Sequence, residues 1–380
     1  MTRHIQFIAC LFVTVCTGLA FAQDNSTNSP VAFVYASSSP SANHYEINAF
    51  TADANGKLTP VSGSPFPANV QNMAVNAKYL FGTNGVNIYS FSIARDGSLE
   101  KVASINAQKF NGYKCGGPIA LFLDHTGTTL YDEDIYGNIC ANNTYQYFSI
   151  DESTGELTYR GATGASLTVS QPPSFIGNNI YAYGSGSYEY NPYISGVKRS
   201  RDGTLADLNI NPAMPVARQG DFYDPWGAAA DRTNHVAISV LPFNGTTWQQ
   251  DGPTQLATYT AGASGNLTTK STFSNMPTSA VKYVTDISMS PTGDLLAVAG
   301  TAGLQIFHFN GANPITHYTG LLSQDQVDQL FWDNHNHLYA ISRSANKLFV
   351  FTITPTSVNS APGSPYTITN PQNITVLPKT

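Results

Sequence analysis

A pattern of two short strands joined by a polar turn recurs along the chain, and it constrains the fold more than any other feature. Each copy has an alternating apolar–polar strand, a turn that usually contains glycine, and a second short strand. The seven copies begin at Ile47, Ile88, Tyr145, Ile194, Leu256, Leu304 and Leu348. Glycine suits these turns because it adopts positive φ angles at no steric cost.

A second hairpin precedes most copies. Examples begin at Met73, Leu121, Ser174, Ala228, Ile287 and Leu330. Their turns are rich in Asp, Ser, Thr and Asn, which form Asx-type turns with the nearby backbone. Each unit therefore has four strands, here called a, b, c and d in chain order. Four short strands per unit, repeated radially, are typical of a β-propeller blade.

The two ends of the chain supply the missing pieces of one unit. Residues 31–38 form a b strand with no a strand before it, and residues 372–378 form an a strand with no unit after it. We therefore predict that the C-terminal strand completes the N-terminal blade and removes the open strand edges. The prediction is an all-β, seven-bladed propeller of four-stranded antiparallel blades over residues 30–380. A β-sandwich or two β domains is the alternative.

The start of the chain differs from the rest. Arg3 precedes an apolar run at 5–19, and Ala20-Phe21-Ala22 has the pattern of a cleavage site. The run is short for a membrane span. We therefore expect a signal peptide over residues 1–22, cleavage before Gln23, and a short disordered N-terminus at 23–29. The mature protein is expected to be periplasmic or secreted.

The charge and cysteine content limit the kinds of partner and the cysteine chemistry that we expect for this chain. Charged residues make up 11% of the 380 residues, the net charge is −6, and no basic cluster occurs. Nucleic acid and anionic membranes are therefore not expected partners. No long apolar run follows the leader, so we expect a soluble monomer. Cys115 and Cys140 remain after cleavage, and a disulfide between them is expected in an oxidising compartment, with free buried thiols as the alternative.

Two short motifs link the repeat to a known family. The c–d turn reads D-G-x-L at 96–99 and 202–205, and an a–b hairpin reads P-T-G-D-L-L-A-V at 291–298. The chain resembles the lactonase-like seven-bladed propellers, the group that contains bacterial 6-phosphogluconolactonase and carboxymuconate cyclases. The segments 63–66 and 363–366 resemble those of secreted bacterial members. The resemblance covers the mature chain and implies a propeller fold with a lactone-directed hydrolase activity.

Connection lengths indicate which face of the propeller carries function. The a–b and c–d turns are short throughout. The insertions all lie in b–c and d–a connections, at 106–118, 132–144, 184–194, 211–226 and 241–255. These connections share one face at the mouth of the central channel, and long loops on a rigid scaffold often carry function.

Acidic residues beside the channel are the candidate catalytic groups. Alignment of the a strands places Asp286 and Asp328 near the channel mouth. There, a carboxylate could act as general base for water that attacks a lactone carbonyl, and Arg218 could stabilise the oxyanion. The alternative is that both aspartates cap strand starts or bind channel water.

Candidate substrate-binding residues lie on the same loops. They are Glu189, Asp221, Tyr223, Trp226 and Trp248. Their aromatic rings could stack on sugar rings or pack the loops over the rim. No metal or cofactor is expected, because His335 and His337 fall in an a–b turn on the other face, and the acidic run at 132–137 lacks the final Glu of a calcium loop.

Two functions are open. The first is hydrolysis of a sugar lactone at the channel mouth, as the family resemblance implies. The second is non-catalytic binding of a glycan or a protein through the long-loop face.

Overall fold

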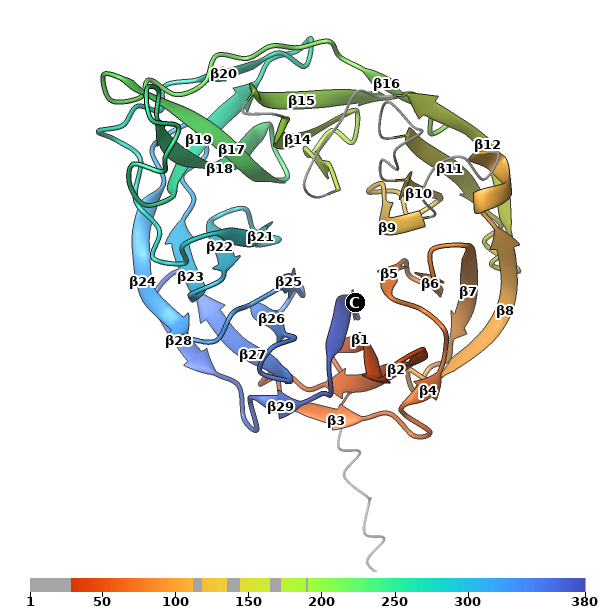
Figure 1. Cartoon of the computed structure of the whole chain (residues 1–380). Coiled ribbons are helices and arrows are strands. Elements are labelled where there is room, and N and C mark those ends of the chain that lie inside the picture. Colours follow the sequence, from red (N-terminus) through yellow and green to blue (C-terminus); the bar gives the residue numbers. More distant parts are fainter. Residues whose placement is uncertain (1–28, 112–117, 135–143, 165–171, 189–190, 380) are drawn as a thin grey trace, which may run out of the picture.

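Seven antiparallel sheets surround a central axis in the computed structural model (Figure 1). The structure describes residues 29–111, 118–134, 144–164, 172–188 and 191–379. Each sheet has a four-stranded path, and two sheets carry one additional strand. The predicted seven-bladed propeller is confirmed. Within the described ranges the one helix is a 3-10 turn at Gln108–Asn111.

Blades 1 to 4 are given from the inner strand to the outer strand. Blade 1 has β30 (Pro371–Pro378), β1 (Ala32–Ser41), β2 (His44–Ala52) and β3 (Leu58–Pro60), with β4 (Phe66–Pro67) beside β2. Blade 2 has β5 (Asn72–Val75), β6 (Tyr79–Thr83), β7 (Asn87–Ile93) and β8 (Leu99–Asn106). Blade 3 has β9 (Pro118–Leu123), β10 (Thr129–Asp134), β11 (Thr144–Ile150) and β12 (Leu157–Gly164). Blade 4 has β13 (Ser174–Phe175), β14 (Tyr181–Tyr188), β15 (Asn191–Arg199) and β16 (Leu205–Asp207).

Blades 5 to 7 follow the same order. Blade 5 has β17 (Asp221–Ala230), β18 (His235–Asn244), β19 (Gln255–Ala261) and β20 (Leu267–Thr269). Blade 6 has β21 (Val284–Met289), β22 (Leu295–Gly300), β23 (Gly303–His308) and β24 (Thr316–Ser323). Blade 7 has β25 (Gln329–Trp332), β26 (His337–Ser342), β27 (Lys347–Thr354) and β28 (Ser357–Ser360), with β29 (Tyr366–Thr367) beside β27.

The ring closes within blade 1. β1 and β30 pair in antiparallel register from Ala32↔Pro378 to Ser37↔Asn373. The alternate side chains of this pair, such as Val34, pack in an apolar cluster that blade 1 shares with blade 7. The predicted completion of the N-terminal blade by the C-terminal strand is therefore confirmed, and β30 covers the inner edge of β1.

One contact recurs at the seams between blades. The first residues of a b strand pack against the glycine of the c–d turn in the next blade. The six pairs are Phe33–Gly97, Tyr79–Gly155, Thr129–Gly203, Tyr181–Gly265, His235–Gly311 and His337–Gly56. Each glycine has a positive φ, and a Cβ built on it would lie 2.6–3.2 Å from the packing side chain. The glycine of the sequence repeat is therefore required both by the turn and by the seam.

Buried tyrosines reinforce three of these seams. Two residues after the packing position, a tyrosine hydroxyl donates a hydrogen bond to the carbonyl of the same glycine. The bonds are Tyr35–Gly97 (3.0 Å), Tyr131–Gly203 (2.6 Å) and Tyr183–Gly265 (2.8 Å). Burial raises the pKa of all three hydroxyls above the usual value, so they remain neutral donors.

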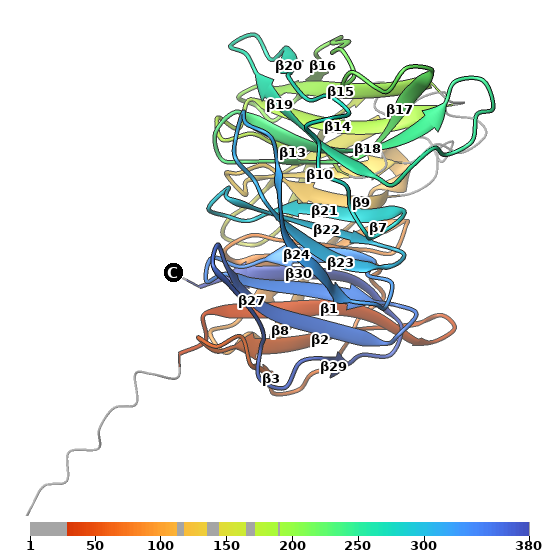
Figure 2. The same cartoon turned by 90° about the vertical axis from the view of Figure 1, so that its left-hand side faces the viewer.

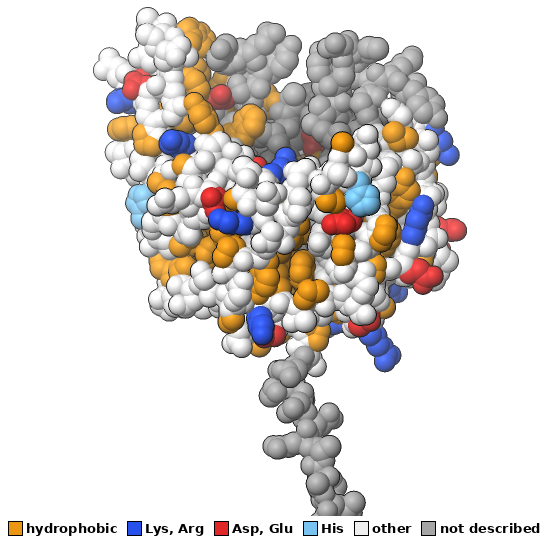
Figure 3. Space-filling view, turned by 60° about the horizontal axis from the view of Figure 1, so that its bottom comes forward, with side chains coloured by type: hydrophobic (Ala, Val, Ile, Leu, Met, Phe, Trp, Pro, Cys, Tyr) orange, Lys and Arg blue, Asp and Glu red, His pale blue; other side chains and the backbone are white. Residues whose placement is uncertain are grey.

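The two faces of the ring differ. We call the face formed by b–c and d–a connections, such as 245–254 and 208–220, the loop face. The face formed by a–b and c–d turns, such as 231–234 and 262–266, is the turn face. Figure 2 shows the β17–β18 hairpin projecting from the loop face, on the right, while β30 ends on the left. In Figure 3 the loop face is uppermost.

We expect Gly97→Ala to destabilise the protein more than Gly85→Ala. The two glycines have nearly equal φ angles, +89° and +86°, but a Cβ at Gly97 would lie 2.6 Å from Phe33, whereas nothing lies within 4 Å at Gly85. An alanine in a left-handed backbone conformation lowers the free energy of unfolding by about 1–2 kcal/mol in both variants. The collision at Gly97 adds about 1–3 kcal/mol. Urea unfolding measures both losses, and equal losses would show that the seam contact is unimportant.

Candidate functional site

Blade 5 carries most of the described candidate residues on the loop face. β17 and β18 pair from Asp221↔Asn244 to Ala230↔Val236, and a bulge interrupts the register between Pro225 and Ala228. Proline has no N–H to donate to the ladder, and bulges re-aim side chains. Trp226 and Gly227 lie in this bulge, and Trp226 is 46% exposed.

Arg218 is bound by two carboxylates at the start of β17. Its Nε lies 2.9 Å from Asp221 Oδ2, and its Nη2 lies 2.8 Å from Asp251 Oδ2. The guanidinium also lies over the Phe273 ring, 5.4 Å from the centroid. The hydrogen bonds that Arg218 donates to Asp221 and Asp251 raise the pKa of Arg218. Its positive charge is therefore already balanced by two neighbours before any ligand binds.

Tyr223 belongs to the same group but is buried. Its hydroxyl donates to Gln255 Oε1 at 2.7 Å, and 2% of the residue is exposed. Burial, and then the Asp221 carboxylate, raise the pKa of Tyr223 to about 12. The structure thus places three predicted site residues near one another: Arg218 pairs with Asp221, and both charges act on the Tyr223 hydroxyl.

A cleft of about 280 Å³ lies between blades 5 and 6 on the loop face. Trp226 and Tyr283, which are 46% and 59% exposed, are its most accessible aromatic residues. The remaining lining residues are Asp224, Ser239, Leu241, Phe243, Thr254 and Val284. The cleft is therefore largely apolar, with one carboxylate in its wall and no Lys or Arg among its lining residues.

Trp248 lies on the same blade but outside the cleft. Its ring packs edge-on against Phe222, with 5.3 Å between the ring centroids, and it is 50% exposed. The backbone of Trp248 is left-handed, with φ at 58°. It is one of the exposed aromatic residues on the rim, and the cleft does not include it.

Asp286 occupies a position that recurs in neighbouring blades. Its Oδ2 accepts the Leu330 N–H of blade 7 at 2.7 Å, and its Oδ1 accepts the Ile287 N–H at 2.8 Å. The equivalent bonds in blades 7 and 1 are Gln329 Oε1 to the Ile374 N–H (2.8 Å) and Asn373 Oδ1 to the Met73 N–H (2.9 Å). Together these three side chains form a belt that joins the inner strands of four consecutive blades.

Asp328 shapes a loop. Its Oδ1 accepts the Gln326 side-chain amide at 2.8 Å, and its Oδ2 accepts the Arg343 N–H, in the β26–β27 connection, at 2.7 Å. The described contacts do not join Arg218 to Asp286 or Asp328. The catalytic assignment of these three residues stays a prediction, as does the substrate-binding assignment of the aromatic residues.

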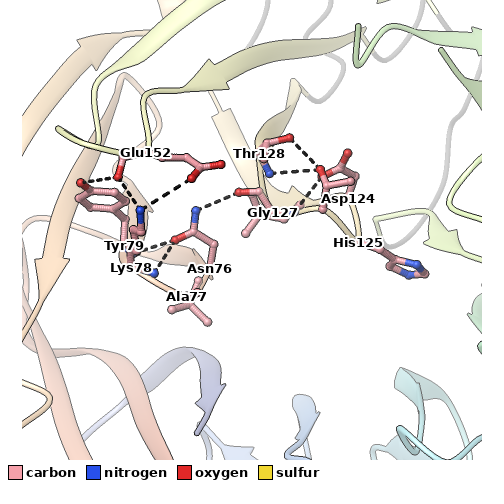
Figure 4. Close-up of a pocket in the computed structure, with 12 residues that line it drawn as sticks. Asn76, Ala77, Lys78, Tyr79, Asp124, His125, Gly127, Thr128 and Glu152 are labelled. Atoms are coloured by element: carbon pink, nitrogen blue, oxygen red, sulfur yellow. Dashed lines mark hydrogen bonds and ion pairs between the residues drawn. The ribbon is translucent and has the colours of Figure 1, made fainter. Parts of the chain in front are cut away.

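A cavity of about 460 Å³ lies on the turn face between the a–b turns of blades 2 and 3. Figure 4 shows its polar groups bonded to one another. Asn76 Oδ1 accepts the Lys78 and Tyr79 N–H groups, and its amide donates to Gly127 O at 2.9 Å. Lys78 Nζ lies 3.7 Å from a Glu152 carboxylate oxygen. This cavity is therefore a by-product of Asx-turn chemistry.

Three predicted site residues lie outside the described residues: Glu189, Cys115 and Cys140. The sequence analysis missed Tyr283 as a candidate. It directly follows Lys282, whose φ is 63°, and precedes β21. Its signal in the sequence is weak, because the preceding d–a connection has no glycine and no distinctive motif.

Comparison with known proteins identifies the fold. No family model and no curated protein sequence matches the chain. A protein from Bacteroides uniformis described as a candidate 6-phosphogluconolactonase is 13% identical, with a TM-score of 0.63 over 92% of this chain and 100% of that chain. A periplasmic gluconolactonase from Pseudomonas aeruginosa is 12% identical, with a TM-score of 0.60 over 91% and 98%. At these identities the similarity shows the propeller fold alone.

We expect Asp286→Ala to destabilise the protein more than Asp286→Asn. Alanine removes the acceptor of the Leu330 N–H, and an unpaired buried amide costs about 1–3 kcal/mol. Asparagine keeps one carbonyl oxygen, and the amide side chains of Gln329 and Asn373 already make the same bond. Urea unfolding of both variants measures the difference. Equal losses for the two variants would contradict a role for Asp286 as an acceptor in the belt.

Proposed function

We propose that this propeller hydrolyses a sugar lactone that binds in the cleft between blades 5 and 6. The observation that carries the proposal is the pairing of two exposed aromatic rings, Trp226 and Tyr283, with the Asp224 carboxylate in one cleft. Small-molecule sites combine mostly apolar and aromatic walls with a few polar groups that orient the ligand. The similarity to the gluconolactonase of Pseudomonas aeruginosa supports the reaction class.

The charge of the cleft favours an unphosphorylated substrate. A phosphate group on a sugar is normally held by Arg, Lys or a helix N-terminus. The cleft residues include neither cation, and the nearby Arg218 is balanced by Asp221 and Asp251. A neutral lactone ring, stacked on Trp226 or Tyr283, meets no unfavourable charge there.

Hydrolysis of a lactone needs a base that takes a proton from water as the water attacks the carbonyl. We infer that Asp224 is this base, because it is the one acidic residue among those that line the cleft. Asp286 and Asp328, the bases predicted from the sequence, each accept two hydrogen bonds from the surrounding protein. These contacts support structural roles for Asp286 and Asp328. A base at Asp224 and a base at Asp286 or Asp328 predict different effects of substitution on the activity.

The test is an assay of the hydrolysis of D-glucono-1,5-lactone and a panel of related sugar lactones. The rate is measured from the acid that the reaction releases. We expect Asp224→Asn to lower kcat by about 10²-fold or more, the typical contribution of a general base. Asp286→Asn and Asp328→Asn should keep kcat within about tenfold of the wild type. A large loss of kcat for Asp286→Asn or Asp328→Asn, with little loss for Asp224→Asn, would show that the base lies beside the channel, as predicted from the sequence.

A second set of variants tests the binding site. Trp226→Ala and Tyr283→Ala should each raise KM by about tenfold, the equivalent of about 1.4 kcal/mol. Trp248→Ala is the matched control, because this exposed tryptophan lies on the same blade but outside the cleft. Its KM should stay within about twofold of the wild type. An equal effect of all three variants would show that the lactone does not bind in the cleft.

Non-catalytic glycan binding is the second candidate function. The observation that favours it is the exposure of three aromatic residues, Trp226, Trp248 and Tyr283, on one face. In that case the protein would turn over none of the lactones and would still bind a glycan through the cleft. Retained glycan binding without turnover on the panel would therefore replace the lactonase proposal.

We also propose that the mature protein acts outside the cytoplasm, after cleavage before Gln23. The apolar leader at 5–19 and the A-F-A site support this proposal, and one structural neighbour is a periplasmic protein. Among the described residues, no helix has the length and apolarity needed to cross a membrane. Mass spectrometry of the exported protein, with thiol alkylation, should give an N-terminus at Gln23 and a Cys115–Cys140 disulfide. A retained leader would contradict the expected cleavage before Gln23. Alkylation of both thiols would contradict the expected disulfide.

A further inference from the structure

Another cavity, of about 340 Å³, lies at the end of the central channel that opens on the turn face. It forms where the inner strands of blades 3 to 7 end on the turn face, namely β9, β13, β17, β21 and β25. It is distinct from the cleft on the loop face, and the two have no lining residue in common. Its volume falls at the lower end of the range for small-molecule sites.

Aromatic side chains from three blades are among the residues that line this channel-end cavity. Phe122, Met289 and Phe331 are half-buried, so part of each side chain faces the cavity. Phe175 and Trp332 complete the wall and are nearly buried. Several aromatic rings from different blades thus surround one space, an arrangement that favours a ligand with a flat apolar body.

Arg232 supplies a positive charge at the cavity. It is exposed, and no ion pair or side-chain hydrogen bond of its guanidinium is found among the described residues. The adjacent Asp231 does not neutralise it, because that carboxylate is buried and bonds to His235 and Thr233. Arg232 therefore differs from Arg218 and Arg199, which form ion pairs with aspartates.

His125 is the second polar group that faces this space. In Figure 4 its ring points away from the other residues of the blade 2–3 cavity. Burial, and then the nearby Arg232, lower the pKa of His125. The ring is therefore mainly neutral at pH 7, and it can donate one hydrogen bond without adding a second cation.

We propose that the channel-end cavity binds a small aromatic carboxylate, with the carboxylate paired to Arg232 and the ring among the aromatic walls. The guanidinium of arginine presents two parallel N–H groups that match a carboxylate. Contact with Phe122, Phe331 and the other aromatic side chains removes apolar surface of the ligand from water. This proposal does not depend on the lactonase proposal, because it concerns different residues on the other face.

Tryptophan fluorescence tests the proposal at a single site. The chain has three tryptophans, and Trp332 is the one that lines this cavity. A variant with Trp226→Phe and Trp248→Phe leaves Trp332 as the only reporter. Titration with benzoate should change its emission saturably. Benzamide, which has the same ring but no charge, should bind at least about tenfold more weakly.

Arg232→Gln, made in the same background, should weaken benzoate binding at least about tenfold and leave benzamide binding unchanged. Arg201→Gln is the matched control, because Arg201 is an exposed arginine in a turn of the turn face and does not line the cavity. Thermal unfolding establishes that each variant is folded.

Three results would overturn the proposal: no saturable change with benzoate, equal affinity for benzamide, or an equal effect of the Arg201 variant. Competition by inorganic phosphate separates a general anion site from the proposed one. Equal binding of phosphate and benzoate would show that the apolar walls contribute nothing, and would also overturn the proposal.

Discussion

The contact between a b strand and the turn glycine of the next blade is the constraint on which this ring depends. A four-stranded blade has two apolar faces and cannot bury either by itself. The seam contact sets how closely neighbouring blades approach, because Phe33 and its equivalents lie where a Cβ would otherwise stand. The β1–β30 pairing then turns a row of blades into a closed ring. The belt of Asp286, Gln329 and Asn373 adds hydrogen bonds between inner strands.

This construction explains why the two faces differ. The turns that form the seams cannot lengthen without disturbing the next blade, so the turn face stays short. The b–c and d–a connections are free of this constraint, and blade 5 uses that freedom in the extended β17–β18 hairpin and its bulge at Trp226. The ends of the inner strands leave a channel-end cavity on the turn face in which Arg232 is the accessible charge.

The fold could be predicted from the sequence because its determinants are local and repeated. The turn glycines, the Asx turns and the split first blade are all visible as patterns, and each has a counterpart in the structure. The site could be predicted only to the level of the face and the blade. Arg218, Asp221 and Tyr223 do lie together, but no sequence pattern indicates that Arg218 is paired twice or that Tyr223 is buried. Tyr283 lines the cleft from blade 6, whereas most of the cleft belongs to blade 5. Which residues of neighbouring blades meet depends on the geometry of the closed ring, and the sequence repeat does not reveal it.

The cleft between blades 5 and 6 is the proposed binding site of the sugar lactone. A crystal structure of Asp224→Asn soaked with D-glucono-1,5-lactone tests it most directly, because the expected loss of the base would preserve the substrate. We predict density for one sugar ring between Trp226 and Tyr283, with its carbonyl carbon facing residue 224. A ring bound beside Asp286 in the channel, with the cleft empty, would contradict the claim.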